Sequence, residues 1–137
     1  MKDTLTVTGV EIHEFLYEFQ GLGKDYNGFN LVYEPGSTVT RRSAVLQIHT
    51  DLGITGEYVT GMSQLTTVPG LTRYLIGKNA LERERIYQDV KRAMRQMARI
   101  GVAVIDVCLW DLAVMYYQAP IWQLLGRHIR LLKCHAP

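Results

Sequence analysis

The sequence predicts an α+β fold in which a three-stranded antiparallel meander precedes a helical bundle. Apolar and polar side chains alternate in residues 5–19, 39–50 and 54–59, which is typical of strands with one buried face. After residue 63, apolar side chains recur three and four positions apart, which indicates helices. The 137 residues suffice for one such domain. They are too few for a complete (β/α)8 barrel, which takes ~250 residues.

Turn-forming residues separate the three predicted strands. Asp51-Leu52-Gly53 supplies a tight turn between the second and third strands. Residues 20–36, between the first and second strands, combine glycines and Pro35 with polar and aromatic side chains. Loops of about this length in a compact domain are usually functional or mobile. We therefore interpret residues 20–36 as a long loop that is either functional or mobile.

The helical half is predicted as four segments and a final strand. Proline in a first helical turn is tolerated, so we place Pro69 near the start of the first helix. The third segment is apolar almost all round, which is typical of a helix in the middle of a bundle. A lone terminal strand needs a neighbour to pair with. The predicted helices are residues 63–76, 81–100, 102–117 and 120–125, and the final strand is residues 129–134.

Composition and charge exclude several classes of partner. The chain has 15 Lys and Arg against 13 Asp and Glu, a net charge of +2, which is too small to predict nucleic-acid binding. Cys108 and Cys134 have no zinc-like spacing and lie in apolar runs, so we expect reduced thiols. We expect no export signal, because the first five residues contain no apolar h-region, and no membrane span, because no apolar run approaches the ~20 residues that a span needs. We expect a soluble, cytoplasmic protein with no membrane partner.

Two aspartates in the predicted third helix invite a metal or acid/base interpretation. Asp106 and Asp111 are five residues apart, so at ~100° per residue their side chains point about 140° from each other on a helix. They cannot easily share an ion. An aspartate in an apolar helix more often accepts a structural hydrogen bond or pairs with an arginine, and we expect that here.

Histidines and basic residues give no specific site either. The four histidines lie on separate predicted elements without a two-ligand spacing, so neither zinc nor a catalytic triad is supported. The basic face of the second helix could bind phosphate groups or a membrane surface, but acidic residues on the same helix favour a solvated face. The histidines are His13, His49, His128 and His135, and the basic residues are Lys91, Arg92, Arg95 and Arg99.

Three local motifs carry a family resemblance. They are residues 50–57 (TDLGITGE), residues 105–112 (IDVCLWDL) and residues 119–126 (APIWQLLG). In this order they resemble the N-terminal capping domain of the enolase superfamily, in its mandelate racemase/muconate lactonising enzyme branch. The resemblance implies a capping domain over residues 1–126 and the first part of a (β/α)8 barrel over residues 127–137.

The resemblance also implies what the chain does. Family members that are racemases or dehydratases abstract the proton α to a carboxylate of a hydroxy acid or acid sugar, while Mg²⁺ stabilises the enediolate. The catalytic and Mg²⁺-binding residues of the family lie on later barrel strands, so the resemblance implies no catalytic or metal-binding residue here. The capping domain instead selects the substrate and excludes water. Its candidate substrate-binding residues in this sequence are Lys24, Tyr26, Asn27 and Tyr58.

One departure and one alternative accompany this interpretation. Residues 114–119 are bulkier than the small, glycine-containing stretch usual in the family, which bears on how the central helix ends. The alternative is a free-standing, self-associating binding module that uses the same domain. An apolar surface left without a barrel favours self-association, so we expect a homo-oligomer. The sequence does not identify the substrate or its stereochemistry.

Overall fold

A computed structural model describes residues 4–23, 35–96 and 101–126. Three strands form one antiparallel sheet in the order β1-β2-β3, with β1 at Val7–Phe19, β2 at Val39–Thr50 and β3 at Thr55–Gly61. The helices follow the sheet in the sequence. The predicted α+β class and the strand-then-helix order are therefore confirmed. The predicted final strand, residues 129–134, lies outside the described residues.

The two faces of the sheet differ in polarity. Ile12, Leu46 and Tyr58 occupy one row of cross-strand partners on the face that the helices cover. The neighbouring row, Glu11, Gln47 and Glu57, faces away from the core. This alternation is the pattern from which the strands were predicted, because successive side chains of a strand point to opposite faces.

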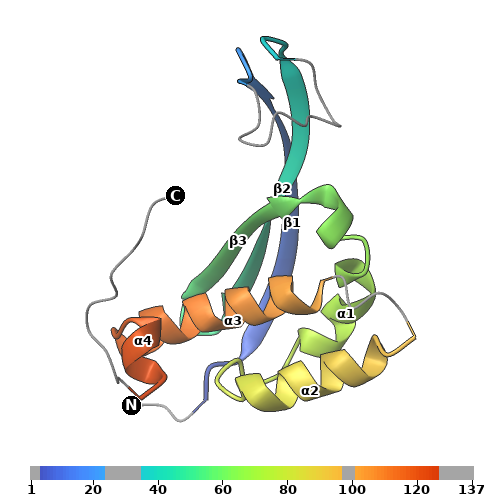
Figure 1. Cartoon of the computed structure of the whole chain (residues 1–137). Coiled ribbons are helices and arrows are strands. Elements are labelled where there is room, and N and C mark those ends of the chain that lie inside the picture. Colours follow the sequence, from blue (N-terminus) through green and yellow to red (C-terminus); the bar gives the residue numbers. More distant parts are fainter. Residues whose placement is uncertain (1–3, 24–34, 97–100, 127–137) are drawn as a thin grey trace.

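The helices pack against the apolar face of the sheet and against each other. Figure 1 shows α3 crossing the sheet, with α2 beside it and α4 following α3 directly. The core side chains Leu46, Ile105, Leu109 and Leu112 are about 1% exposed or less. The bounds are Met62–Gln64 for the 3-10 helix η1, Val68–Leu75 for α1, Arg83–Ala93 for α2, Val102–Tyr117 for α3 and Ile121–Leu124 for α4.

The first two helices are shorter than the sequence predicted. The predicted helix at residues 63–76 is in fact η1, a turn and then α1, which has Pro69 in its first turn. Proline has no amide hydrogen to donate, so a helix begins at it more readily than it runs through it. Of the predicted helix at residues 81–100, the described part is helical over Arg83–Ala93 and forms a turn at residues 94–96, and residues 97–100 lie outside the described residues. Met94 in that turn is still buried, so apolar periodicity continued past the end of the helix.

The central helix begins and ends with left-handed residues. Gly101 precedes it with φ 97°, and a Cβ there would lie 2.5 Å from Thr67 Oγ1, so only glycine fits. Gln118 ends it with φ 50°, a conformation that favours glycine. Gln118 lies in the stretch that departs from the family pattern. The helix nevertheless ends where the sequence predicted, because α3 has the predicted bounds.

Backbone hydrogen bonds tie the start of the chain to the segment between α1 and α2. Val7 N donates to Lys78 O, and Gly77 N donates to Val7 O, each at 2.9 Å. Ala80 N donates to Leu5 O at 2.7 Å. The Asn79 side chain adds a bond by accepting from Leu5 N at 2.9 Å. The foot of β1 is thus joined to residues that follow it by some 70 positions.

Candidate functional site

Part of β1 and β2 extends beyond the rest of the sheet. The last β2–β3 pair is Ser43 with Gly61, and Ser43 also pairs with Phe15, so residues 16–19 and 39–42 form a two-stranded ribbon, which we call the arm. Figure 1 shows the arm projecting away from the helices. Among the described residues, no third strand or helix covers the arm, and Leu16 there is 67% exposed.

Aromatic side chains contact one another along one face of the arm and its base. Phe15, Tyr17 and Phe19 alternate along β1, so they share a face. The Tyr17 ring centroid lies 5.9 Å from that of Phe15 and 5.1 Å from that of Phe19, and the latter pair is edge-to-face. These contacts run along the ribbon and compensate in part for the missing core.

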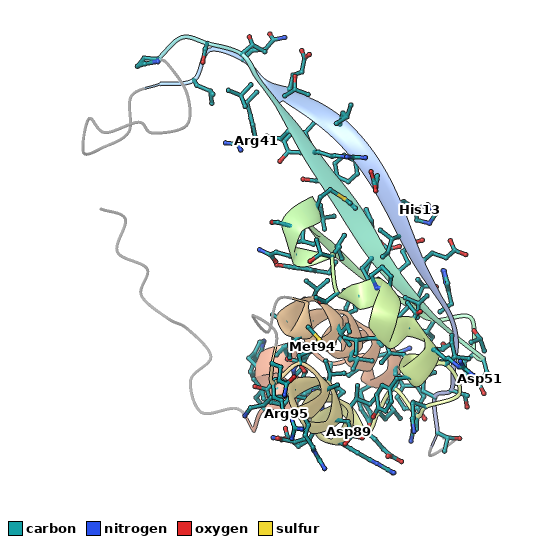
Figure 2. The ribbon with its side chains drawn as sticks, turned by 90° about the vertical axis from the view of Figure 1, so that its right-hand side faces the viewer. His13, Arg41, Asp51, Asp89, Met94 and Arg95 are labelled. Atoms are coloured by element: carbon teal, nitrogen blue, oxygen red, sulfur yellow. The ribbon has the colours of Figure 1, made fainter. Side chains whose placement is uncertain are left out.

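Two arginines on β2 bring positive charge to the arm. Arg42 donates from Nη2 to Glu14 Oε2 at 2.5 Å, so its charge is paired. Arg41 is exposed and projects from the concave side of the arm, whereas His13 lies on the convex side (Figure 2). A guanidinium group suits a carboxylate because it can donate two parallel hydrogen bonds. Sequence reasoning placed Arg41 in a strand but missed it as a site candidate.

The end of the arm is closed by backbone hydrogen bonds. Leu22 N donates to Ser37 O at 3.3 Å, and Gly36 N donates to Leu22 O at 2.6 Å. Gly21 and Gly36 have φ of 62° and 82°, which glycine adopts readily. Residues 24–34 connect the two strands at this point. Lys24, Tyr26 and Asn27 lie outside the described residues, so their assignment as substrate-binding residues stays a prediction.

Tyr58 is the one predicted site residue that the structure describes. It lies in β3 on the helix-covered face, opposite Leu46, and is half-buried against the core. The arm begins beyond the end of β3, so Tyr58 belongs to the body of the domain. Its contacts are those of a packing residue, and whether it also touches a substrate stays a prediction.

The two aspartates of α3 have separate structural partners, as expected. Asp111 Oδ2 accepts a hydrogen bond from Glu57 N at 2.9 Å, which joins α3 to β3. Burial raises the pKa of the Asp106 carboxyl, and the nearby Arg83 opposes this shift. Burial likewise lowers the pKa of Arg83, which Asp106 opposes. The Arg83 guanidinium carbon lies 3.4 Å from the centroid of the Trp110 ring, a close cation–π contact between α2 and α3.

The sheet register brings together two histidines that the sequence kept apart. Glu11 Oε2 lies 2.9 Å from His13 Nε2, and Glu11 Oε1 lies 3.6 Å from His49 Nε2. His49 Nδ1 is 3.0 Å from Thr55 Oγ1. Only the β1–β2 register, which places His49 beside Gly9, could have revealed this cluster. It lies on the polar face of the sheet.

Residues 4–23, 35–96 and 101–126 offer neither a metal-binding cluster nor a reactive thiol. No group of three or more His, Cys, Asp or Glu side chains in this part of the chain could hold a metal ion. Cys108 is buried, and burial raises the pKa of its thiol to about 12, so it is not a reactive nucleophile. None of the helices in these residues has the length and apolar character needed to cross a bilayer.

The basic face of α2 is largely paired or solvated. Arg92 Nη2 lies 3.3 Å from Asp89 Oδ1, and the side chains of Arg92 and Arg95 are exposed. Figure 2 shows Asp89 and Arg95 toward the outside of the molecule, with Met94 lying inward of them. Arg99 lies outside the described residues. The expectation of a solvated face is consistent with this arrangement.

The described geometry is that of a rigid α+β body with a charged arm, and comparison with known proteins supplies the family. The model of the mandelate racemase / muconate lactonizing enzyme N-terminal domain matches residues 34–126. The chain belongs to this family. The matched residues include β2, β3 and all the helices, together with the three motifs noted in the sequence. A comparison with curated proteins finds no match.

Solved structures of the enolase superfamily share the fold. D-glucarate dehydratase from Agrobacterium tumefaciens, complexed with magnesium, is 27% identical over 90% of this chain and 33% of its own, with a TM-score of 0.73. The 3,6-anhydro-D-galactonate cycloisomerase of Zobellia galactanivorans is 22% identical over 88% of this chain and 32% of its own, with a TM-score of 0.66.

A third structure shows the same fold at lower identity. An enolase from Bradyrhizobium, complexed with magnesium and mandelic acid, is 18% identical over 92% of this chain and 36% of its own, with a TM-score of 0.71. The chain therefore spans about a third of the length of the solved chains that it resembles.

Proposed function

We propose that this domain selects the substrate of an enzyme of the mandelate racemase / muconate lactonizing enzyme family that acts on a hydroxy acid or acid sugar. The similarity to a D-glucarate dehydratase and to a 3,6-anhydro-D-galactonate cycloisomerase supports a sugar acid. The proposed reaction of the whole enzyme removes the proton α to the carboxylate, and racemisation or dehydration follows.

The arm is the observation that carries the proposal. It holds the attachment points of residues 24–34 away from the helical body, with the exposed Arg41 on its concave side. Lys24, Tyr26 and Asn27 lie in that connection. A cation with hydrogen-bond donors beside it can bind a carboxylate and the hydroxyls of a sugar acid. Binding through such groups would exclude water from the reacting carbon.

The part of this chain in the reaction is to bind and orient the acid. Because the described residues contain no group that fits Mg²⁺, we assign no metal ligand and no proton transfer to them. In an enzyme of this kind we expect Mg²⁺ at residues outside this described part. On this proposal the chain alone is inactive, and its residues alter which acid the complete enzyme accepts.

Exchange of the α-proton tests the proposal. The chain should be assayed alone, and joined to the two thirds of a relative that it does not cover, by NMR of hydroxy acids in D₂O. We expect exchange only in the joined protein. Lys24→Gln should lower kcat/KM for a sugar diacid by about tenfold, the effect of losing one charged hydrogen bond of ~1.4 kcal/mol.

The matched control replaces a lysine away from the arm. Lys91 lies on α2 beside Tyr87, so Lys91→Gln should leave kcat/KM unchanged. The proposal is wrong if the isolated chain exchanges the α-proton, or if Lys24→Gln and Lys91→Gln behave alike.

A self-associating binding module remains the second candidate. Exposed apolar side chains on α3, α4 and the arm favour it, since such side chains are commonly covered by another chain. This candidate predicts a stable homo-oligomer of the 137-residue chain with no dependence on any catalytic partner. Light scattering measures the mass of the purified chain in solution, and the mass of a monomer would reject this second candidate.

A further inference from the structure

The two edges of the sheet differ in what covers them. At the β3 edge, Glu57 N donates to Asp111 Oδ2 of α3 at 2.9 Å. At the β1 edge, backbone hydrogen bonds with residues 77–80 extend as far as Val7. Beyond Val7, no strand in the described part of the chain pairs with this edge, since β2 lies on the other side of β1. Among the described residues, the outer edge of residues 9–19 is therefore open.

An open strand edge can bind a further strand. Its backbone N–H and C=O groups form hydrogen bonds with the incoming strand, and the side chains that lie opposite each other set the register. The side chains of Glu11 and His13 at this edge are accessible, because they are 55% and 58% exposed. Figure 2 shows His13 on the convex side of the sheet, away from the helices. A strand bound here would leave the concave side, where Arg41 projects, uncovered.

The order of side chains along β1 makes this edge complementary to itself. When two copies of β1 pair antiparallel about a two-fold axis at Ile12, Glu11 of each copy lies opposite His13 of the other. A carboxylate opposite an imidazole is a favourable cross-strand pair, and the symmetry provides this pair twice. The same axis places the two copies of Ile12 opposite each other on the other face, where they form an apolar pair.

Other symmetric registers of this edge lack such a match. An axis at Glu11 or Glu14 places two carboxylates opposite each other, which is destabilising. An axis at His13 places the two imidazoles opposite each other and Glu11 opposite Phe15. Axes at residues 10 and 15 place neither glutamate opposite a histidine. Charge complementarity therefore favours the axis at Ile12.

We infer that residues 9–15 of β1 pair antiparallel with the same residues of a second copy of this chain, with the two-fold axis at Ile12. The overlap is short, because residues 5–7 already pair with residues 77–80, and residues 17–19 of the other copy would lie opposite them. So short an overlap belongs with the interfaces below about 1,200 Å², which are weak or transient, so we expect a reversible dimer. The inference does not rest on the proposed function.

Charge exchange at the two paired positions tests the inference. Sedimentation of the 137-residue chain over a series of concentrations gives the dissociation constant of the dimer. We expect Glu11→Lys and His13→Glu each to raise this constant at least about tenfold, because each replaces two attractive contacts by repulsive or unpaired ones. The double variant Glu11→Lys/His13→Glu should restore the constant to within about threefold of the wild type. Glu18→Lys, an exposed position of the same strand outside the overlap, is the matched control and should change nothing.

Several results would overturn the inference. One is a wild-type chain that stays monomeric at every concentration, which would leave this edge to another part of the protein. Another is a dimer that neither Glu11→Lys nor His13→Glu weakens, or a double variant that binds no more tightly than the single ones. Equal weakening by Glu18→Lys would show a general effect of charge and would also reject the pairing.

Disulfide formation checks the register without any charge reversal. In a Cys134→Ser background, Cys108 is buried, so the introduced cysteine is the accessible thiol. Under oxidised glutathione, a Glu11→Cys chain should form a mixed disulfide with a His13→Cys chain at least about tenfold faster than with a Phe15→Cys chain. Phe15 lies opposite Glu11 only when the axis is at His13. Equal rates, or faster crosslinking to Phe15→Cys, would reject the inferred register even if a charge variant failed to fold.

Discussion

At the scale of single residues, Arg83 and Asp106 approach each other where α2 meets α3, and both are partly buried there. Burial lowers the pKa of Arg83 and raises the pKa of Asp106, and their mutual attraction only partly opposes these shifts. The Trp110 ring under the guanidinium offers a further favourable contact for the cation. For the Asp106 carboxylate, the effect of burial on the pKa outweighs the attraction of Arg83, so its ionised form costs stability.

The pH dependence of stability should expose this cost. The folded-state pKa of Asp106 is above the unfolded one, so the native state binds the proton more tightly. The contribution of Asp106 therefore falls as pH rises through the window between the ordinary aspartate pKa near ~3.9 and the raised folded value. We expect Asp106→Asn to match the wild type below this window and to be more stable above it, as measured by urea unfolding from pH 3 to 7.

A surface carboxylate provides the comparison. Glu18 is exposed on the arm, so Glu18→Gln should show no such gain above the window. A stability difference for Asp106→Asn that is independent of pH, or a loss at neutral pH, would contradict the assignment.

At the scale of elements, the tightest contact in the domain is that of β3 with α3. A Cβ added at Gly56 would lie 2.3 Å from Cys108 O and 2.6 Å from Leu112 Cγ. At the next residue of the strand, Glu57 N donates a hydrogen bond to Asp111 Oδ2 of the helix. Strand and helix thus approach closely because one residue has no side chain and its neighbour finds an acceptor on the helix.

Alanine substitutions at the two glycines of β3 should distinguish the effect of steric crowding against α3 from the effect of replacing a glycine as such. Gly56→Ala must push the α3 backbone or shift the strand, so we expect a loss of about 3 kcal/mol in the free energy of unfolding. Gly61→Ala meets no atom within 4 Å and should change that free energy by less than about 1 kcal/mol. Urea titration of both variants measures the difference, and similar losses would show that the close approach is not limiting.

The elements that could be predicted from sequence are those with an uninterrupted pattern. The bounds of α3 match because its apolar run ends with residues that leave the helix, and β2 matches because its alternation is regular. The second helix was overestimated because Met94, beyond its end, is still buried. The periodicity of apolar residues indicates which side chains are buried, and side chains can stay buried after the backbone has left the helix.

The candidate site was predictable only in part, for a physical reason. Sequence composition singled out the connection at residues 20–36, and Lys24 in it stays untested. Arg41 and the Glu11–His49 contact depend on the twist and register of the β1–β2 ribbon. A shift of one residue would reverse both faces, so these contacts could be predicted only from the pairing of β1 with β2.

At the scale of the whole molecule, the domain combines a packed body with an arm that lacks a core. The buried apolar side chains lie between the sheet and the helices, while the arm relies on backbone pairing and on contacts such as Tyr17 with Phe19. A two-stranded ribbon is marginally stable by itself in water. The arm should therefore open independently of the body.

Amide hydrogen exchange should show this division within a single strand. We expect amides of β1 residues 16–19 to exchange at least about tenfold faster than those of residues 7–12, which lie over the core. NMR of the 137-residue chain in D₂O measures both sets together, so the body amides serve as the internal control. Equal protection along β1 would show that another surface covers the arm.

The bonds that join Leu5 and Val7 to residues 77–80 set an order of events during synthesis on the ribosome. The β1–β2 hairpin needs only the first 50 residues, but its foot finds its backbone partners after residue 80 has left the exit tunnel. Until then, the N-terminal edge of the nascent sheet is open to other nascent chains, which is a period when chaperones are needed. Pauses in translation before residue 80 has left the tunnel would lengthen that period, whereas pauses after it has left would not.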